Sequence, residues 1–130
     1  MRRMTLVLLA IGLCPIFLSL GAAAAAQQDA HFADVPAKDH ARVNPLADKP
    51  DAISAGASLY KAHCAECHQA DARGDGAKKP SLRNPQVRSA TDGDLEWFLR
   101  QGDLRHGMPS WSSLTQAQRW ALVTYLRSLE

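Results

Sequence analysis

The sequence lacks a surplus of charge over most of its length. Arg2 and Arg3 are the only charged residues before Asp29, and without them the 15 Lys+Arg fall to 13, which equals the 13 Asp+Glu. The formal net charge of +2 therefore belongs to the first residues, and the rest of the chain is neutral. Nucleic-acid binding depends on phosphate contacts from a basic surface. The composition thus excludes a nucleic-acid binder held by net positive charge.

The sequence also lacks the length for a large enzyme and the patterns of a sheet or a repeat protein. No stretch alternates polar and apolar residues with period two, and no internal repeat appears. The 130 residues, less the leader described next, make one small domain at most. After that leader the only cysteines are Cys64 and Cys67, and a disulfide between them would close too short a loop to constrain the chain.

The first 26 residues have the order of a secretory signal peptide. A positive start at 1–3 is followed by an apolar run at 4–20 and by small residues at 22–26. We expect cleavage after Ala26 and hence a periplasmic protein. The alternative is an uncleaved anchor, because residues 6–26 are uncharged and long enough to span a bilayer. A glycine and a proline within the apolar run favour removal, and we expect membrane attachment only if the leader is retained.

Residues 27–50 have few large apolar side chains and three prolines that interrupt any helical period. This composition predicts a flexible linker or a loosely packed N-terminal arm. His31 and His40 lie in this segment without a ligand motif beside them, so we expect both at the surface.

Residues 51–130 predict a small all-α domain with three main helices. Asp51 is a candidate N-cap for a helix that ends near His63. A second helix begins after the N-cap Thr91 and ends at Gly102. Thr115 with Gln118 three residues on forms the capping box of the last helix.

Two long loops, 69–90 and 103–113, separate these helices. A domain of this size rarely has a sufficient core without a staple, and loops of such length usually serve a functional site. We therefore expect a bound group to fill the centre of the domain.

The pentad Cys64-Ala65-Glu66-Cys67-His68 is the attachment sequence of a c-type haem. Two cysteines three residues apart can reach the two vinyl groups on one porphyrin edge and form a thioether with each. The next residue, His68, then lies under the ring with its imidazole directed at iron. The sequence therefore predicts one covalently attached haem c.

Other uses of the two cysteines have less support. A thioredoxin-like C-x-x-C needs a βαβ context, which is absent from the pattern. A structural zinc site needs a second ligand pair, and His63 and His106 do not form a short-spaced pair. A chance occurrence of the pentad remains the last alternative.

Met108 is the only methionine after the leader, and it lies in a loop between Gly107 and Pro109. A methionine usually fills a core, but this one is not on an apolar helix face. Together with the pentad, its position predicts the second axial ligand of the haem iron. Thioether sulfur favours Fe(II), so a His/Met pair raises the reduction potential.

With these residues the chain resembles the class I c-type cytochromes over roughly Ala52–Leu129. The matching positions are Cys64, Cys67, His68, Met108 and Pro109 for the haem, with Gly56, Tyr60, Leu122 and Tyr125 for the two terminal helices. The resemblance implies a cytochrome c fold, with long loops wrapped round one haem. It also implies that the first and last helices cross closely, with the small glycine permitting the approach.

The resemblance further implies that the Pro80 carbonyl accepts a hydrogen bond from His68 Nδ1, which would orient the ring. Lys79 stands where the family often has glycine. Trp111 is a candidate to line the haem edge or to donate to a propionate. Weaker candidates for the haem surroundings, for which we expect core packing or surface positions, are Trp97, Arg83, Arg88, Arg105 and His106.

These features predict a monomeric, periplasmic one-electron carrier that exchanges electrons with dehydrogenase, oxidase or cytochrome partners and is not an enzyme. With both axial positions filled, the iron would have no site for substrate. Three alternatives stay open: a fixed cytochrome subunit of a periplasmic dehydrogenase or terminal oxidase complex, an open-site haem enzyme or gas sensor, and a haem-free interaction module.

Overall fold

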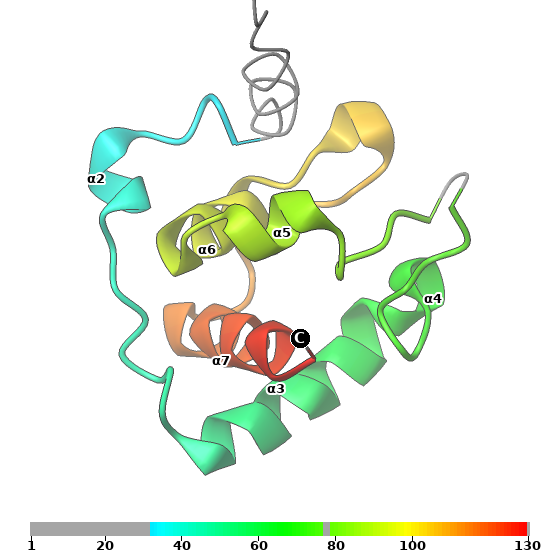
Figure 1. Cartoon of the computed structure of the whole chain (residues 1–130), viewed down its shortest axis with the longest axis horizontal. Coiled ribbons are helices and arrows are strands. Elements are labelled where there is room, and N and C mark those ends of the chain that lie inside the picture. Colours follow the sequence, from blue (N-terminus) through cyan, green and yellow to red (C-terminus); the bar gives the residue numbers. More distant parts are fainter. Residues whose placement is uncertain (1–31, 77–78, 130) are drawn as a thin grey trace, which may run out of the picture.

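The computed structural model describes residues 32–76 and 79–129, and these ranges form helices and loops without a named strand. The predicted leader and His31 lie outside the described residues. Figure 1 shows the helices, whose bounds are α2 (Ala37–His40), α3 (Pro50–His63), α4 (Ala65–His68), α5 (Pro85–Ser89), α6 (Asp92–Gln101), the 3-10 helix η1 (Leu104–His106) and α7 (Gln116–Ser128). The all-α prediction is confirmed. None of the described helices is long and apolar enough to cross a membrane.

The helices α3 and α7 make the most extensive helix pair of the fold. They approach most closely at Gly56, where an added Cβ atom would lie 2.1 Å from the Ala121 carbonyl oxygen. One turn further along α3, Tyr60 packs its ring on Tyr125 with the centroids 5.3 Å apart. Leu122 completes this buried contact at 1% exposure. The close glycine contact implied by the resemblance is therefore present.

The ends of α6 and α7 are fixed by local capping. Thr91 Oγ1 accepts from Asp94 N, and the Asp94 carboxylate accepts from Thr91 N. Thr115 and Gln118 make the same reciprocal pair at the start of α7. Both capping boxes satisfy amide groups that a helix start leaves without partners. Gly102 ends α6 with φ of 71°, as predicted.

The start of α3 differs from the prediction. Lys49 occupies the N-cap without a side-chain hydrogen bond, Pro50 takes the first helical position, and Asp51 lies within the first turn. A proline is well suited to that position because its missing N–H would have no helical partner there. Asp51 therefore does not cap α3. Its negative charge lies near the positive N-terminal end of the helix dipole, where it is stabilising.

The loop predicted over 69–90 contains the additional short helix α5. Asn84 caps it by accepting from Val87 N at 2.8 Å, and Pro85 takes its first position. The remaining loop includes Gln69 and Ala72, which have positive φ values of 67° and 60°. Left-handed backbone at such residues is held by surrounding contacts, and the Ala72 carbonyl accepts from Leu82 N at 2.8 Å.

The described part of segment 27–50, for which the sequence predicts a flexible linker or an N-terminal arm, packs against the helices. Phe32 packs on Phe98 with ring centroids 5.5 Å apart, and the short helix α2 follows. Asp39 is buried and accepts from Arg100 at 2.9 Å. Buried Asn44 donates to Thr124 on α7 at 3.0 Å. Polar side chains with distant partners thus attach the arm to α6 and α7, although it has few large apolar groups.

Candidate functional site

The pentad lies at the junction of α3 and α4. Cys64 ends α3 and begins α4, and its carbonyl accepts from the amides of Cys67 at 3.1 Å and His68 at 2.9 Å. The tight turn places both cysteines and the histidine within one short segment. Tyr60 Oη donates to the Gln69 carbonyl at 2.7 Å, which holds the left-handed residue directly after His68. The sequence did not reveal this second role of Tyr60.

His68 is fixed by the hydrogen bond that the resemblance implies. Its ring nitrogen Nδ1 lies 2.8 Å from the Pro80 carbonyl oxygen, and the residue is 9% exposed. A carbonyl only accepts, so Nδ1 carries the proton and donates. The lone pair is then on Nε2, the nitrogen that can bind a metal. The protein has therefore selected one tautomer and one ring orientation.

Lys79 replaces the expected glycine without breaking this arrangement. Its amide donates to the Asp75 carboxylate at 3.1 Å, and its carbonyl accepts from Asp75 N at 2.9 Å. Its ammonium donates to the Glu66 carbonyl at 3.1 Å, inside the pentad. The turn also needs Gly74, because a Cβ there would lie 1.9 Å from the Lys79 carbonyl oxygen. This turn therefore depends on a glycine at position 74.

The two cysteine thiols are free and lie in unequal surroundings. Cys64 is 8% exposed and belongs to the hydrophobic core, whereas Cys67 is exposed. Burial, with a smaller effect of Cys67, raises the pKa of the Cys64 thiol to about 11. No group of three metal-ligating His, Cys, Asp or Glu side chains occurs in the described ranges, so the zinc site considered above finds no third ligand there.

The segment with Met108 is a short hairpin attached to the end of α6. Met108 and Asp103 exchange backbone hydrogen bonds of 2.8 and 2.9 Å across the turn formed by η1. Gly102 lies against the following backbone, where a Cβ would come within 2.6 Å of the Pro109 carbonyl carbon. Met108 is partly buried against the core cluster. Its thioether is thus carried by a segment with a defined backbone.

Trp111 connects this hairpin to the pentad. Its ring packs on His63, the residue before Cys64, with centroids 5.1 Å apart, and its amide donates to the Leu99 carbonyl at 2.8 Å. His63 is otherwise exposed. The structure therefore brings the region that follows Met108 next to the start of the pentad, which the sequence separation of these residues did not reveal.

The weaker candidates divide into two groups. Arg88, Arg105 and His106 are exposed, and His106 pairs with Asp103 at 2.6 Å. Trp97 and Arg83 are partly buried. Among the described residues, Arg83 Nε is a buried side-chain donor without a hydrogen-bond partner in the chain. Arg83 lies in the loop just after Pro80, so its position near the pentad histidine separates it from the other arginines.

Sequence reasoning missed a buried ion network that involves Glu96 and Arg119. Glu96 is 0% exposed and Arg119 is 7% exposed, and their side chains pair at 2.8 Å. A possible signal was present: both charged residues stand among the apolar positions that α6 and α7 bury. Neither residue belongs to a recognised haem motif, and pairing between separate helices is not visible in a single sequence.

Comparison with known proteins agrees with this geometry. A family model described as cytochrome C oxidase, cbb3-type, subunit III matches residues 51–126. A protein described as cytochrome c550, from Pseudomonas aeruginosa, is 35% identical over 92 residues, or 65% of this chain and 61% of that relative. The chain thus spans about three-fifths of the relative's length.

The helical fold, the pentad and the oriented histidine are those of a class I c-type cytochrome. The chain belongs to the family of cytochrome C oxidase, cbb3-type, subunit III, which its residues 51–126 match. Membership implies covalently bound haem c with its iron and supports a role in electron transfer.

The residues present fit haem c on three observations. The cysteine thiols are free to form thioethers, and the His68 tautomer leaves Nε2 for iron. The buried donor Arg83 Nε has no acceptor among residues 32–76 and 79–129, and a haem propionate is an anionic acceptor that would satisfy it. These three groups correspond to different parts of the cofactor. The thiols would bind the vinyl groups, Nε2 would bind the iron, and Arg83 would bind a propionate.

Proposed function

We propose that the protein is a one-electron carrier in which Cys64 and Cys67 hold the haem, while His68 and Met108 are the axial ligands. The observation that carries the proposal is the 2.8 Å bond between His68 Nδ1 and the Pro80 carbonyl, which prepares Nε2 for iron. When bound, the haem supplies an iron that cycles between Fe(II) and Fe(III). The Pro80 carbonyl would raise the basicity of His68, and the Asp103–Met108 hairpin would hold the Met108 thioether.

This ligand set supports transfer of electrons without bond chemistry at iron. Two protein ligands on one iron leave no position for a substrate, so the open-site enzyme and the gas sensor are disfavoured. A polarisable thioether opposite a histidine stabilises the reduced state and places the potential in a range suited to respiratory exchange. The protein is then not an enzyme.

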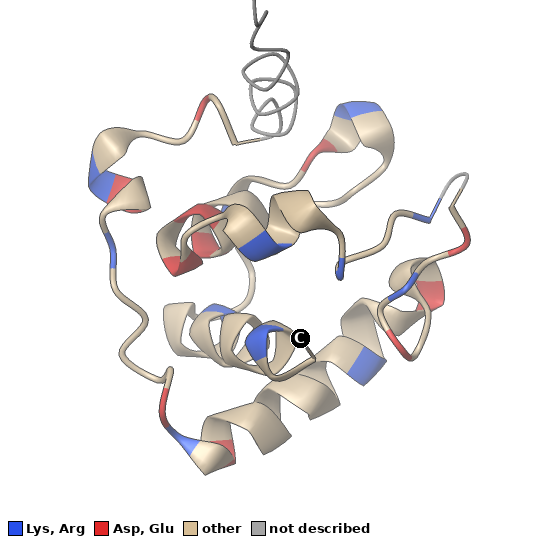
Figure 2. Ribbon diagram, viewed as in Figure 1, with Lys and Arg blue, Asp and Glu red and all other residues tan. Residues whose placement is uncertain are grey.

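Electron exchange would take place near the exposed side of the pentad. Cys67 is exposed there, and the Lys79 ammonium lies on the adjacent Glu66 carbonyl. Figure 2 shows Lys and Arg interspersed with Asp and Glu along the chain, in keeping with the neutral balance of the sequence after Arg3. Docking to redox partners would therefore rely on local charges and be weak and transient. We propose a monomer, exported to the periplasm by a cleaved leader.

Two measurements on the exported protein test the proposal. Denaturing electrophoresis under reducing conditions should leave haem peroxidase stain on the polypeptide, because thioethers survive both treatments. The ferric absorption spectrum should show the weak far-red band of sulfur ligation. Loss of haem on the gel would contradict covalent attachment. Absence of the far-red band with rapid binding of added ligand would indicate an open iron site instead.

A Cys67→Ala variant extends the electrophoresis test. Haem attachment and core formation are coupled in this proposal, so the variant should accumulate mainly as unfolded, degraded chain. Circular dichroism of any recovered protein measures this. A stable helical protein without haem would instead support the haem-free interaction module.

A second candidate is a cytochrome subunit fixed in a terminal oxidase or dehydrogenase complex. The observation that favours it is the family description, which names an oxidase subunit. Mild extraction followed by size-exclusion chromatography distinguishes the two functions. A carrier should elute at the size of the free chain, whereas a fixed subunit should co-purify with its complex.

A further inference from the structure

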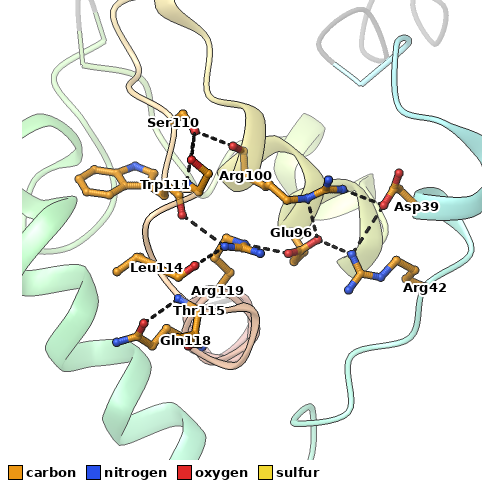
Figure 3. A network of polar contacts seen from close by, with 11 residues as sticks. Asp39, Arg42, Glu96, Arg100, Ser110, Trp111, Leu114, Thr115, Gln118 and Arg119 are labelled. Carbon is orange, nitrogen blue, oxygen red and sulfur yellow. Dashed lines mark hydrogen bonds and ion pairs between the residues drawn. The ribbon is translucent and has the colours of Figure 1, made fainter.

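Arg119 connects three parts of the molecule from a buried position on α7. Its Nε donates to Glu96 Oε1 on α6 at 2.8 Å. Its Nη1 donates to the Leu114 carbonyl and, at 3.4 Å, to the Trp111 carbonyl. Figure 3 shows the guanidinium between Glu96 and the segment that leads from Trp111 to Thr115. One side chain therefore joins α6, α7 and the segment that follows Met108.

The Glu96 carboxylate is oriented by further cations. Arg42 Nη1 donates to Glu96 Oε2 at 2.5 Å, and Arg100 Nε lies 3.8 Å from the same oxygen. Asp39 balances these arginines from α2, at 2.9 Å from Arg100 and 3.6 Å from Arg42. Both carboxylate oxygens of the fully buried Glu96 are thus occupied. A charge in this position needs such partners, because burial without them is strongly unfavourable.

The segment after Met108 also contacts α6 and, through the Trp111 ring on His63, the end of α3. Trp111 N donates to the Leu99 carbonyl at 2.8 Å, and Ser110 Oγ donates to the Arg100 carbonyl at 2.7 Å. Arg119 adds a connection from α7 at the far end of the segment. The two sets of contacts fix residues 110–114 at both ends, and the hairpin that bears Met108 immediately precedes them.

We propose that Arg119, oriented by Glu96, is a positioning residue that holds Met108 in place as the iron ligand. This inference rests on the proposed His/Met ligation. A thioether is a weak, neutral ligand, so its occupancy depends on how well the backbone pre-organises the sulfur. When the 110–114 segment is released at one end, Met108 samples more positions and loses ligation to competitors.

Arg127 provides a matched control on the same helix. Its Nε donates to Asp92 on α6 at 2.8 Å, and its Nη atoms donate to backbone carbonyls of residues 87–90, including Ala90. Arg127 thus repeats the arrangement of Arg119, with one acidic partner on α6 and several carbonyls, but these carbonyls belong to Val87 and Arg88 of α5 and to its C-cap Ala90. A change there perturbs comparable interactions and leaves the Met108 segment alone.

The test compares Arg119→Lys, Glu96→Gln and Arg127→Lys as ferric holoproteins titrated with imidazole, which competes with the thioether for iron. The far-red sulfur band follows displacement, and denaturant unfolding reports overall stability. Arg119→Lys should lower the imidazole concentration for half-displacement about tenfold, the effect of losing one hydrogen bond of ordinary strength. Glu96→Gln should act in the same direction by misorienting Arg119, and the reduction potential of both should fall. Arg127→Lys should lose stability, while its imidazole concentration for half-displacement and its reduction potential should stay as in the wild type.

Equal imidazole affinity in wild type and Arg119→Lys, with the far-red band present in both, would overturn the positioning role and leave His/Met ligation intact. An equal shift in Arg127→Lys would also overturn it, because general destabilisation would then explain the effect. Absence of the band from wild type would overturn the proposed ligation and this inference together. If Arg119→Lys does not fold, Glu96→Gln gives the same comparison with a side chain of unchanged shape.

Discussion

Gly56 and Ala121 meet backbone to backbone where α3 crosses α7, with room for no atom larger than hydrogen between them. A Cβ at Gly56 would lie 2.1 Å from the Ala121 carbonyl oxygen and 2.7 Å from the Tyr125 Cβ. The neighbouring atoms belong to helix backbone and to the Cβ of the partly buried Tyr125, so they cannot swing away. The spacing between α3 and α7 is therefore determined by the absence of a side chain at Gly56.

Gly56→Ala should destabilise the holoprotein by about 3 kcal/mol, at the upper end for overpacking, because the helices must separate. Chemical denaturation measures the change. At a solvated helix position the same substitution would stabilise by about 1 kcal/mol, so the sign alone distinguishes the two cases. Ala55→Gly, on the exposed face of α3, is the control and should cost about 1 kcal/mol. A gain in stability for Gly56→Ala would contradict the close crossing.

Met108→Ala should fold and retain covalent haem, but its reduction potential should fall. Axial ligands adjust haem potentials over a range of about 0.8 V, so a decrease on the order of 0.1 V is expected when the thioether is removed. Spectroelectrochemical titration gives the value. Leu104→Ala is the control, since Leu104 is on the same hairpin and 79% exposed. An unchanged potential in Met108→Ala would count against ligation.

Tyr60→Phe should alter stability at alkaline pH. Burial raises the pKa of Tyr60 above its ordinary value of 10.0. Above pH 10 the unfolded chain releases this proton while the folded protein retains it, so stability falls as pH rises. The loss approaches about 1.4 kcal/mol per pH unit for one proton.

The Phe variant removes this contribution and should show a shallower decline above pH 10. It should also be less stable near neutrality by about 1 kcal/mol, because the hydrogen bond to the Gln69 carbonyl is lost. Urea denaturation of both holoproteins at a series of pH values measures the two effects. Parallel pH profiles would show that Tyr60 does not hold its proton more tightly in the folded state.

The capped helices and the pentad were predictable because their causes are local. Thr91 with Asp94 encodes a helix start within four residues, and the C-x-x-C-H spacing encodes its chemistry directly. The start of α5 also has a local signal, an asparagine followed by a proline. The resemblance supplied the bond between His68 and Pro80, which no pattern within the sequence would indicate.

The packed arm and the ion network were not predictable for a different reason. Asp39 pairs with Arg100, which is 61 positions away in the sequence, and Asn44 pairs with Thr124, which is 80 positions away. Such pairs give no periodicity, and hydrophobic content alone suggested that the arm was loose. The arm is held by hydrogen bonds and ion pairs, and these depend on a tertiary arrangement that must form first.

Asn44→Ala tests whether the arm contributes to stability. The side chain donates to Thr124 Oγ1 at 3.0 Å and accepts from Leu46 N at 2.9 Å, and the residue is buried. Its removal leaves a buried amide and a hydroxyl with fewer partners, which should cost about 2 kcal/mol. Asp48→Ala, at an exposed position of the same arm, should have little effect. Equal midpoints of thermal unfolding for the two variants would show that the arm contributes no stability.

The unequal burial of the two cysteines has a consequence for the order of assembly. Cys64 is enclosed by the core and its thiol resists ionisation there, while Cys67 remains accessible. We therefore expect thioether formation at Cys64 while the chain is still open, before the core encloses this thiol. Haem attachment would then come first and closure of the fold second. The finished fold would shield the Cys64 thioether from further reaction.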